Sequence, residues 1–214
     1  SIVGPIFSLL SAVSTMVGAG GCTLLARYIG AGEHDNARTV SSLSAWICVL
    51  CGTAALVSFN LFCRPLLSLL GTTAEIWGYA ENYFRILSVG APFMLFSTGF
   101  AMLLRGEGAI KEGFFIGLLG TGINMILDPV LILLCGMGVS GAALATVAGN
   151  LTSCVCVLWY IRKRSAVLTV RPSYALRRPA LAWRIILLGL PNAASSLLSG
   201  FASTFSNQLL SGYG

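Results

Sequence analysis

Apolar blocks of about 20 residues recur along the sequence, and their length constrains the fold more than any other feature. A helix of about 20 residues crosses the hydrocarbon core of a bilayer, because each residue adds about 1.5 Å of rise. Six such blocks occupy residues 1–26, 44–63, 84–104, 114–135, 139–161 and 185–213. They are continuously apolar, without the two-residue alternation of a membrane β-barrel. The pattern predicts an all-α, polytopic bundle of transmembrane helices.

Lys and Arg are concentrated in alternate connectors between the blocks. Connectors 27–43, 105–113 and 162–184 hold eleven of the 13 basic residues, and only Arg64 and Arg85 lie at the other end of the spans. The positive-inside rule therefore places these three connectors in the cytoplasm of a multi-pass plasma-membrane protein. Topology thus accounts for the net charge of +6, so we expect contact with the lipid bilayer and no nucleic-acid partner.

Both ends of the sequence are apolar. No basic segment precedes SIVGPIFSLL, as a signal peptide would require, and no charged flank follows NQLLSGYG. We therefore expect a fragment of a longer polytopic protein, with a complete six-helix protein as the alternative.

Sequence signals of enzyme chemistry are weak. Cys48 and Cys51 form a single CxxC pair in an apolar block, and the one histidine, His34, lies in the polar segment GEHDNAR. The seven cysteines lie in or beside apolar blocks, where cysteine usually acts as a small hydrophobic residue. The sequence holds no GxSxG, HExxH or GxxxxGK[ST] motif. We expect no catalytic residues, no enzyme activity and no cofactor.

One acidic residue, Asp128, interrupts the apolar run GTGINMILDPVLILL. On a helix over 114–135 it shares a face with Asn124, Thr121 and Gly117, because residues three and four apart lie together. Amide, hydroxyl and carboxylate oxygens suit a hard cation such as Na⁺, and a desolvated carboxylate can equally carry a proton. The segment therefore has the chemistry of a cation site.

Pro129 follows this acid directly. A proline lacks the backbone N–H, so it frees the carbonyl of Met125 and tends to kink the helix. Since ionisable residues within a membrane are expensive and mostly functional, we interpret the segment as a site for a coupling ion. The alternative is a structural Asp128 that pairs with a basic or hydroxyl group on a neighbouring helix.

Four segments carry a family resemblance: GAGGCTLLARYIGAGEHDNARTV, LLRGEGAIKEG, GINMILDPVLILLCGMGVSGAALATV and ILLGLPNAASSLL. In this order and spacing they resemble conserved segments of the multidrug and toxic compound extrusion (MATE) family. The resemblance covers essentially the whole chain, from within the second of the family's twelve helices to the seventh. It implies a cation-coupled antiporter that exchanges Na⁺ or H⁺ for bulky, often cationic drugs by alternating access.

The resemblance also implies a division of the chain. Residues 1–161 would supply helices 2 to 6 of the first six-helix lobe. Residues 162–184 would form the cytoplasmic linker between lobes, and residues 185–214 the truncated first helix of the second lobe. We expect a monomer whose partners are small-molecule drugs and the bilayer.

Site residues are carried over from the family by motif. Asn124 and Asp128 match its fifth-helix cation site, with Na⁺ as a candidate ligand, and Thr146 matches a hydroxyl that joins that site. Thr98 is the best candidate at a fourth-helix position where the family can place an Asn. The family's acidic first-helix residue would lie upstream of Ser1.

Two other functions stay open. A lipid-linked oligosaccharide flippase of related architecture would need a strongly basic central cavity, and the spans contain no central Arg or Lys. An intramembrane enzyme would need a second acid or a histidine at membrane depth.

Overall fold

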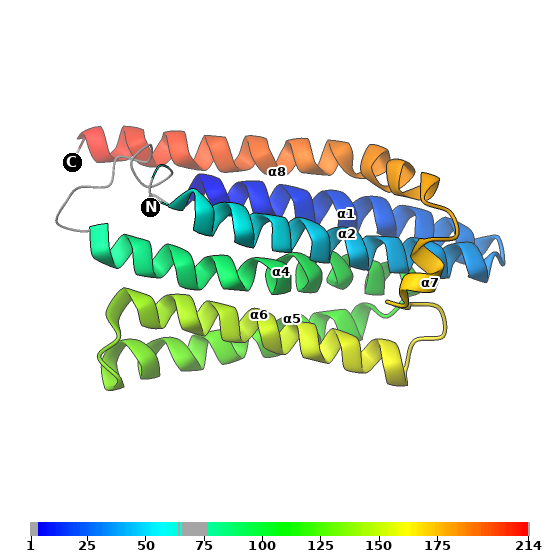
Figure 1. Ribbon diagram of the computed structural model, residues 1–214, viewed down its shortest axis with the longest axis horizontal. Helices are drawn as coiled ribbons and strands as arrows, with labels where there is room; N and C mark the ends of the chain where they lie inside the picture. The colour runs from blue at the N-terminus through cyan, green and yellow to red at the C-terminus, as the bar shows by residue number, and fades with distance from the viewer. Residues whose placement is uncertain (1–3, 64, 66–76, 214) are drawn as a thin grey trace.

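Long helices make up most of the protein. The computed structural model describes residues 4–63, 65 and 77–213. Its long helices are α1 (Gly4–Gly30), α2 (His34–Leu61), α4 (Trp77–Glu107), α5 (Ile110–Pro129), α6 (Gly138–Lys163) and α8 (Ala180–Tyr213). A π-helix, η1 (Val130–Leu134), continues α5, and a short helix, α7 (Pro172–Ala175), precedes α8. Figure 1 shows the long helices side by side, with α7 at one end of the bundle.

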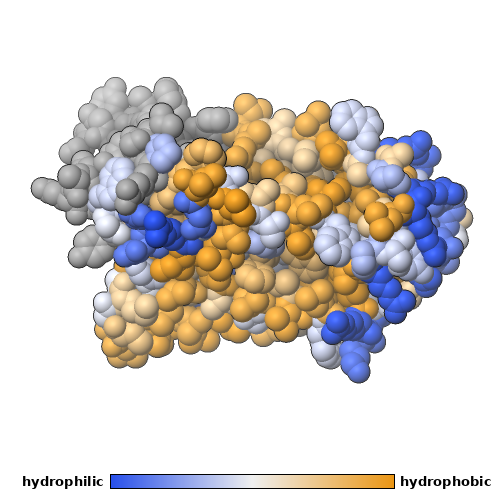
Figure 2. Space-filling model, in the orientation of Figure 1, coloured by the Kyte–Doolittle hydropathy of each residue, from blue (hydrophilic) through white to orange (hydrophobic). Residues whose placement is uncertain are grey.

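The predicted fold class is confirmed for the part of the chain that the structure describes. Six helices there are long and apolar enough to cross a membrane: Ser8–Gly30, His34–Leu61, Ala80–Glu107, Ile110–Leu134, Gly138–Lys163 and Ala180–Gly200. The described ranges contain no strand. Figure 2 shows a mainly hydrophobic flank, with hydrophilic residues gathered towards the ends of the bundle.

The polar connectors are shorter than the sequence predicts. Helix α2 begins at His34, so most of the predicted loop 27–43 is helical. Only two residues separate α4 from α5 within the predicted loop 105–113, and α6 and α8 take residues from both ends of 162–184. Apolar sequence marks the part of a helix that lipid surrounds, whereas the helical hydrogen bonds continue into polar sequence.

Helix α4 lies at the centre of the helix packing. It contacts α1, α2, α5 and α6, while α1 also packs along α8. Many of the large, fully buried side chains belong to α4, including Phe84, Leu95, Phe100, Leu103 and Leu104. Helices in lipid pack largely through close approach at small residues. Gly52 of α2 is such a residue, because a Cβ atom there would lie 2.4 Å from Cα of Pro92 in α4.

The connector between α6 and α8 is hydrogen-bonded to α2. Ser41 Oγ donates to the carbonyl oxygen of Thr169 (3.0 Å) and accepts from the Thr169 amide (3.0 Å). Ser42 Oγ donates to the carbonyl oxygen of Arg171 (2.5 Å). These bonds hold residues 169–171 against the first turns of α2.

Glu107, the last residue of α4, holds the preceding part of the connector. Its Oε1 atom accepts hydrogen bonds from Ser165 Oγ (2.5 Å) and the amide of Val167 (3.2 Å). Ser165 Oγ also accepts from the amides of Val167 (3.2 Å) and Leu168 (2.7 Å). Residues 165–171 are therefore attached to the ends of α2 and α4.

Candidate functional site

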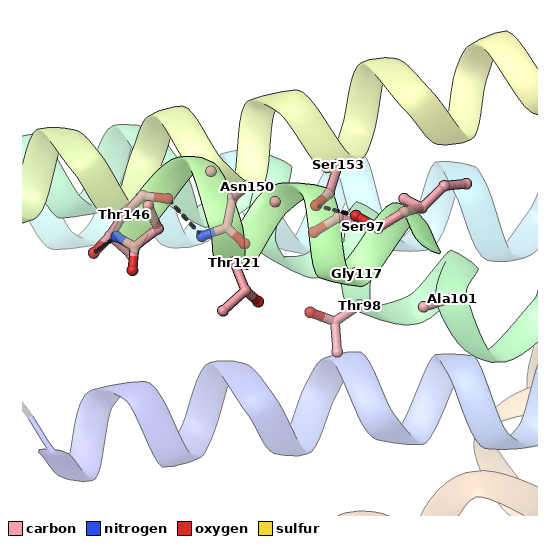
Figure 3. Close-up of a pocket in the computed structure, with 12 residues that line it drawn as sticks. Ser97, Thr98, Ala101, Gly117, Thr121, Thr146, Asn150 and Ser153 are labelled. Carbon is pink, nitrogen blue, oxygen red and sulfur yellow. Dashed lines mark hydrogen bonds between the residues drawn. The ribbon is translucent and has the colours of Figure 1, made fainter. Parts of the chain in front are cut away.

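Helices α4, α5 and α6 line a partly open cavity of about 330 Å³, which we call the α4–α5–α6 pocket (Figure 3). No residue that lines it carries a charge. The lining residues are mostly small or neutral and polar: Ser97, Thr98, Ala101, Ile116, Gly117, Gly120, Thr121, Asn124, Thr146, Gly149, Asn150 and Ser153. The pocket therefore offers hydroxyl and amide groups within an otherwise apolar bundle.

Two glycines allow α5 and α6 to approach closely beside this pocket. A Cβ atom on Gly149 would lie 2.6 Å from the carbonyl oxygen of Gly120, and one on Gly120 would lie 2.0 Å from Ser153 Oγ. Any larger residue would push the helices apart. The close approach brings Asn124 of α5 opposite Thr146 of α6.

A chain of hydrogen bonds links the polar residues of the two helices (Figure 3). Asn124 Nδ2 donates to Thr146 Oγ1 (3.4 Å), and the Thr146 hydroxyl donates to the carbonyl oxygen of Ala142 (2.9 Å). Asn150 Nδ2 donates to the carbonyl oxygen of Thr146 (3.1 Å). Both asparagines use their N–H groups in these bonds, which leaves their side-chain oxygens as acceptors for a ligand.

The structure brings three of the four predicted coupling residues to this pocket, namely Asn124, Thr146 and Thr98. Asp128 lies one helical turn beyond Asn124 and is outside the lining of the pocket. Its Oδ1 atom is buried and has no hydrogen-bond partner among the described residues. The ion pairs in the described part of the chain, Arg38–Asp35 and Arg85–Glu81, do not include Asp128.

Tyr83 of α4 was not predicted as a site residue, yet it lies within electrostatic range of the Asp128 carboxylate. It is separated from Asp128 by 45 positions and precedes the predicted span 84–104 by one residue, so no local pattern connects the two. Asn150 and Ser153 were also missed. They continue a stripe of polar residues from Thr146 at three- and four-residue spacing, which the sequence does contain.

Helix α5 changes its geometry directly after Pro129. The next five residues, Val130–Leu134, form the π-helix η1. A π-helix and a proline each disturb the regular hydrogen-bond ladder of an α-helix, and π-turns often occur at functional sites. The disturbance expected from Pro129 thus lies next to Asp128.

The donor set of this region favours a hard cation or a proton over a transition metal. Oxygen atoms are the ligands offered by Asp128, Asn124 and Thr146, and no group of three or more His, Cys, Asp or Glu residues occurs among the residues described. Cys48 and Cys51 of the CxxC pair are both free thiols.

Comparison with known proteins places this chain in a family. The MatE family model matches residues 1–130, which include α1, α2, α4 and α5. The chain belongs to the MatE family. It is a multi-pass protein of the plasma membrane, as the sequence predicted.

Among the relatives of this MatE chain is the multidrug export protein MepA of Staphylococcus aureus (strain NCTC 8325 / PS 47). The two are 28% identical over 214 residues, which is all of this chain and 48% of MepA. MepA of Staphylococcus saprophyticus is also 28% identical, with the same coverage. The chain spans about half the length of the curated relatives it matches.

Solved MATE structures share the fold of the chain. A MATE transporter in the straight conformation matches with a TM-score of 0.89 and 27% identity, over 100% of this chain and 48% of that one. The inward-facing conformation of a multidrug resistance MATE transporter matches with a TM-score of 0.87 and 27% identity, over 94% of this chain and 46% of that one. The resemblance to MATE proteins seen in the sequence is therefore confirmed.

Proposed function

We propose that this chain supplies the ion-coupling part of an antiporter, in which entry of Na⁺ or H⁺ drives export of bulky, often cationic drugs. The observation that carries the proposal is the environment of Asp128. Its buried Oδ1 atom has no hydrogen-bond partner in the part of the chain described, and the acid lies one turn from the Asn124–Thr146 pair. Burial of a carboxylate oxygen without a partner is costly, and a bound cation would offset that cost.

The neighbouring oxygens suit the same role. Asn124 and Thr146 face each other across α5 and α6, so a cation at Asp128 would find neutral oxygen ligands one turn away. Tyr83 of α4 lies within electrostatic range of the acid. Residues from three helices would thus sense whether the acid is charged.

Pro129 and η1 provide a way to convert the charge of Asp128 into movement. The helical hydrogen-bond ladder is already disturbed at this point. In the proposed cycle, binding and release of the cation change the bend of α5 and so reshape the α4–α5–α6 pocket. The affinity of the cavity for the drug changes with its shape. This change couples entry of the cation to export of the drug.

The pocket lining favours this function over a flippase for anionic lipid-linked sugars. Such a substrate carries phosphates, whose recognition requires Arg, Lys or clustered amide groups. The α4–α5–α6 pocket is lined by neutral residues. The names of the MepA relatives, which describe multidrug export, point in the same direction.

The test replaces Asp128 by Asn in the transporter and measures ethidium efflux from cells. We expect efflux to be abolished with normal expression, because Asn keeps the size of Asp128 but cannot take up charge or a proton. Asp35→Asn is a matched control, since Asp35 is the other aspartate and its side chain is 79% exposed. Unchanged efflux in the Asp128→Asn variant would refute the proposal.

A further inference from the structure

A second cavity, of about 310 Å³, lies between α2, α4 and α6 and has a different character from the α4–α5–α6 pocket. All nine residues that line it are apolar: Ala45, Trp46, Val49, Pro92, Phe93, Phe96, Cys154, Leu158 and Val170. We call it the α2–α4–α6 groove. It contains none of the residues assigned to cation coupling.

The groove lies in the half of the bundle that the positive-inside rule places towards the cytoplasm. Val170 belongs to the connector that runs over the cytoplasmic ends of α2 and α4, and Leu158 lies five residues before the end of α6. Pro92 lies fifteen residues before the end of α4, or about 22 Å along the helix axis. The groove therefore runs from the cytoplasmic surface towards the middle of the bilayer, which is the depth of an acyl chain in the inner leaflet.

The walls of the groove are partly exposed. The Trp46 side chain is 38% exposed, and Val49, Phe93 and Leu158 are half-buried. Polar solutes find no partner there, because every lining side chain is apolar. An acyl chain gains little from the hydrophobic effect when it moves from bulk lipid into the groove, since both are apolar. Selectivity for one lipid must therefore come from its headgroup.

Two arginines belong to the segments that form the cytoplasmic end of the groove. Arg171 directly follows the lining residue Val170 and is exposed. Arg38 lies two helical turns, about 10 Å, before the lining residue Ala45 on the same face of α2. The Arg38 side chain is held by the bond from its Nη2 atom to the carbonyl oxygen of Ala166 (3.4 Å), and the backbone of Arg171 is held by the bond from Ser42 to its carbonyl oxygen.

Two acids, Asp35 and Glu107, accompany the arginines near this end of the groove, and the Glu107 Oε1 atom already accepts hydrogen bonds from Ser165 and Val167. Arg38 Nη1 lies 3.9 Å from Asp35 Oδ1, a long contact to an exposed acid that neutralises it only partly. The guanidinium has five N–H donors, of which the contact with Ala166 uses one. Arg38 thus keeps N–H donors for an anionic phosphate at the cytoplasmic end of the groove.

From this juxtaposition of an apolar groove and two arginines, we propose that the groove binds an anionic phospholipid of the cytoplasmic leaflet. One acyl chain lies along Trp46, Phe93 and Leu158, and the headgroup phosphate lies between Arg38 and Arg171. The site is separate from the cation site, and the proposal does not depend on the coupling function.

The experiment uses Trp46 as the probe, because it lines the groove. A variant of the transporter with Trp46 as its only tryptophan is reconstituted in vesicles that contain brominated phosphatidylglycerol or brominated phosphatidylcholine. Bromine quenches tryptophan fluorescence on contact, so the quenching reports which lipid occupies the groove. We expect phosphatidylglycerol to be preferred over phosphatidylcholine, by about five-fold for each arginine that contacts the headgroup.

Substitution of the two arginines then tests the assignment of the headgroup. In the double variant Arg38→Gln, Arg171→Gln, the preference for phosphatidylglycerol over phosphatidylcholine should fall to a ratio near one. Arg177→Gln is the matched control, because Arg177 is an exposed arginine of the same connector whose guanidinium lies over the Tyr174 ring. It should leave the preference unchanged.

Each of three outcomes would overturn the proposal. Equal quenching by both lipids would show that the groove does not select for charge. A preference that survives the double substitution would show that Arg38 and Arg171 do not hold the headgroup. Absence of quenching by either lipid would show that protein covers the groove. Native mass spectrometry of phosphatidylglycerol retained by the unmodified transporter and by the arginine variants gives the same comparison without tryptophan substitutions.

Discussion

Gly20 of α1 packs directly against the backbone of Gly189 in α8: a Cβ atom on Gly20 would lie 3.0 Å from the Gly189 nitrogen. The contact is tight in both directions, because a Cβ atom on Gly189 would lie 1.8 Å from the carbonyl oxygen of Met16. Thr15 and Ser196 share a hydrogen bond of 3.1 Å between the same helices. Under the proposed division of the chain, this is a contact between the two lobes.

The Gly189→Ala variant should separate α1 from α8. The new methyl group would meet backbone atoms, which cannot rotate away, so we expect a loss of about 1 to 3 kcal/mol in stability. Thermal unfolding in detergent measures the change. Gly30→Ala is the control, since a Cβ atom on Gly30 at the end of α1 has no neighbour within 4 Å. Equal melting temperatures for Gly189→Ala and the unmodified protein would contradict this prediction.

The Thr146→Val variant should weaken coupling-ion binding. Valine keeps the shape of threonine but removes the hydroxyl that faces Asn124. Loss of one oxygen ligand should reduce apparent ion affinity roughly ten-fold, measured as the Na⁺ or pH dependence of drug transport in vesicles.

Thr152→Val provides the matched control for Thr146→Val. Thr152 lies on the same helix and makes the same bond, from its hydroxyl to the carbonyl oxygen four residues earlier, at the same 2.9 Å. It does not line the pocket. If both variants shift the ion dependence equally, the effect comes from α6 itself and not from the site.

The Ser165→Ala variant should loosen the connector. Without the hydroxyl, the amide of Leu168 loses its acceptor and Glu107 loses a donor. Loss of about 1 to 1.5 kcal/mol should raise the hydrogen-exchange rate of the amides of Val167 and Leu168 about ten-fold. Ser173→Ala, at an exposed serine of α7, should leave these rates unchanged. Unaltered exchange in Ser165→Ala would show that other contacts hold this segment.

Cys135 tests the orientation of the chain. It is exposed at the end of η1, whereas the other six cysteines are buried or half-buried. With the basic connectors in the cytoplasm, a membrane-impermeant maleimide should label Cys135 in intact cells, and Cys135→Ser should abolish that labelling. Labelling that requires permeabilised cells would place the connectors outside.

The membrane spans were predictable because a bilayer imposes a length and a composition on every helix that crosses it. The same argument does not predict where helices end, as at His34. These ends lie in polar sequence, where the bilayer does not constrain the composition. The face that carries Asn124 and Asp128 could be predicted from helical spacing within one element. The electrostatic relation of Asp128 to Tyr83 could not, because it depends on how α4 packs beside α5.

The hydrogen bonds of the connector also have a mechanical consequence. Residues 165–171 are bonded to α2 and α4, so only residues 172–179 separate the last attached residue from α8. Four of these are helical, so the segment extends at most about 20 Å. A tether of that reach limits how far the first turn of α8 can swing from the ends of α2 and α4. The connector would thus limit how far α8 can rock relative to α2 and α4.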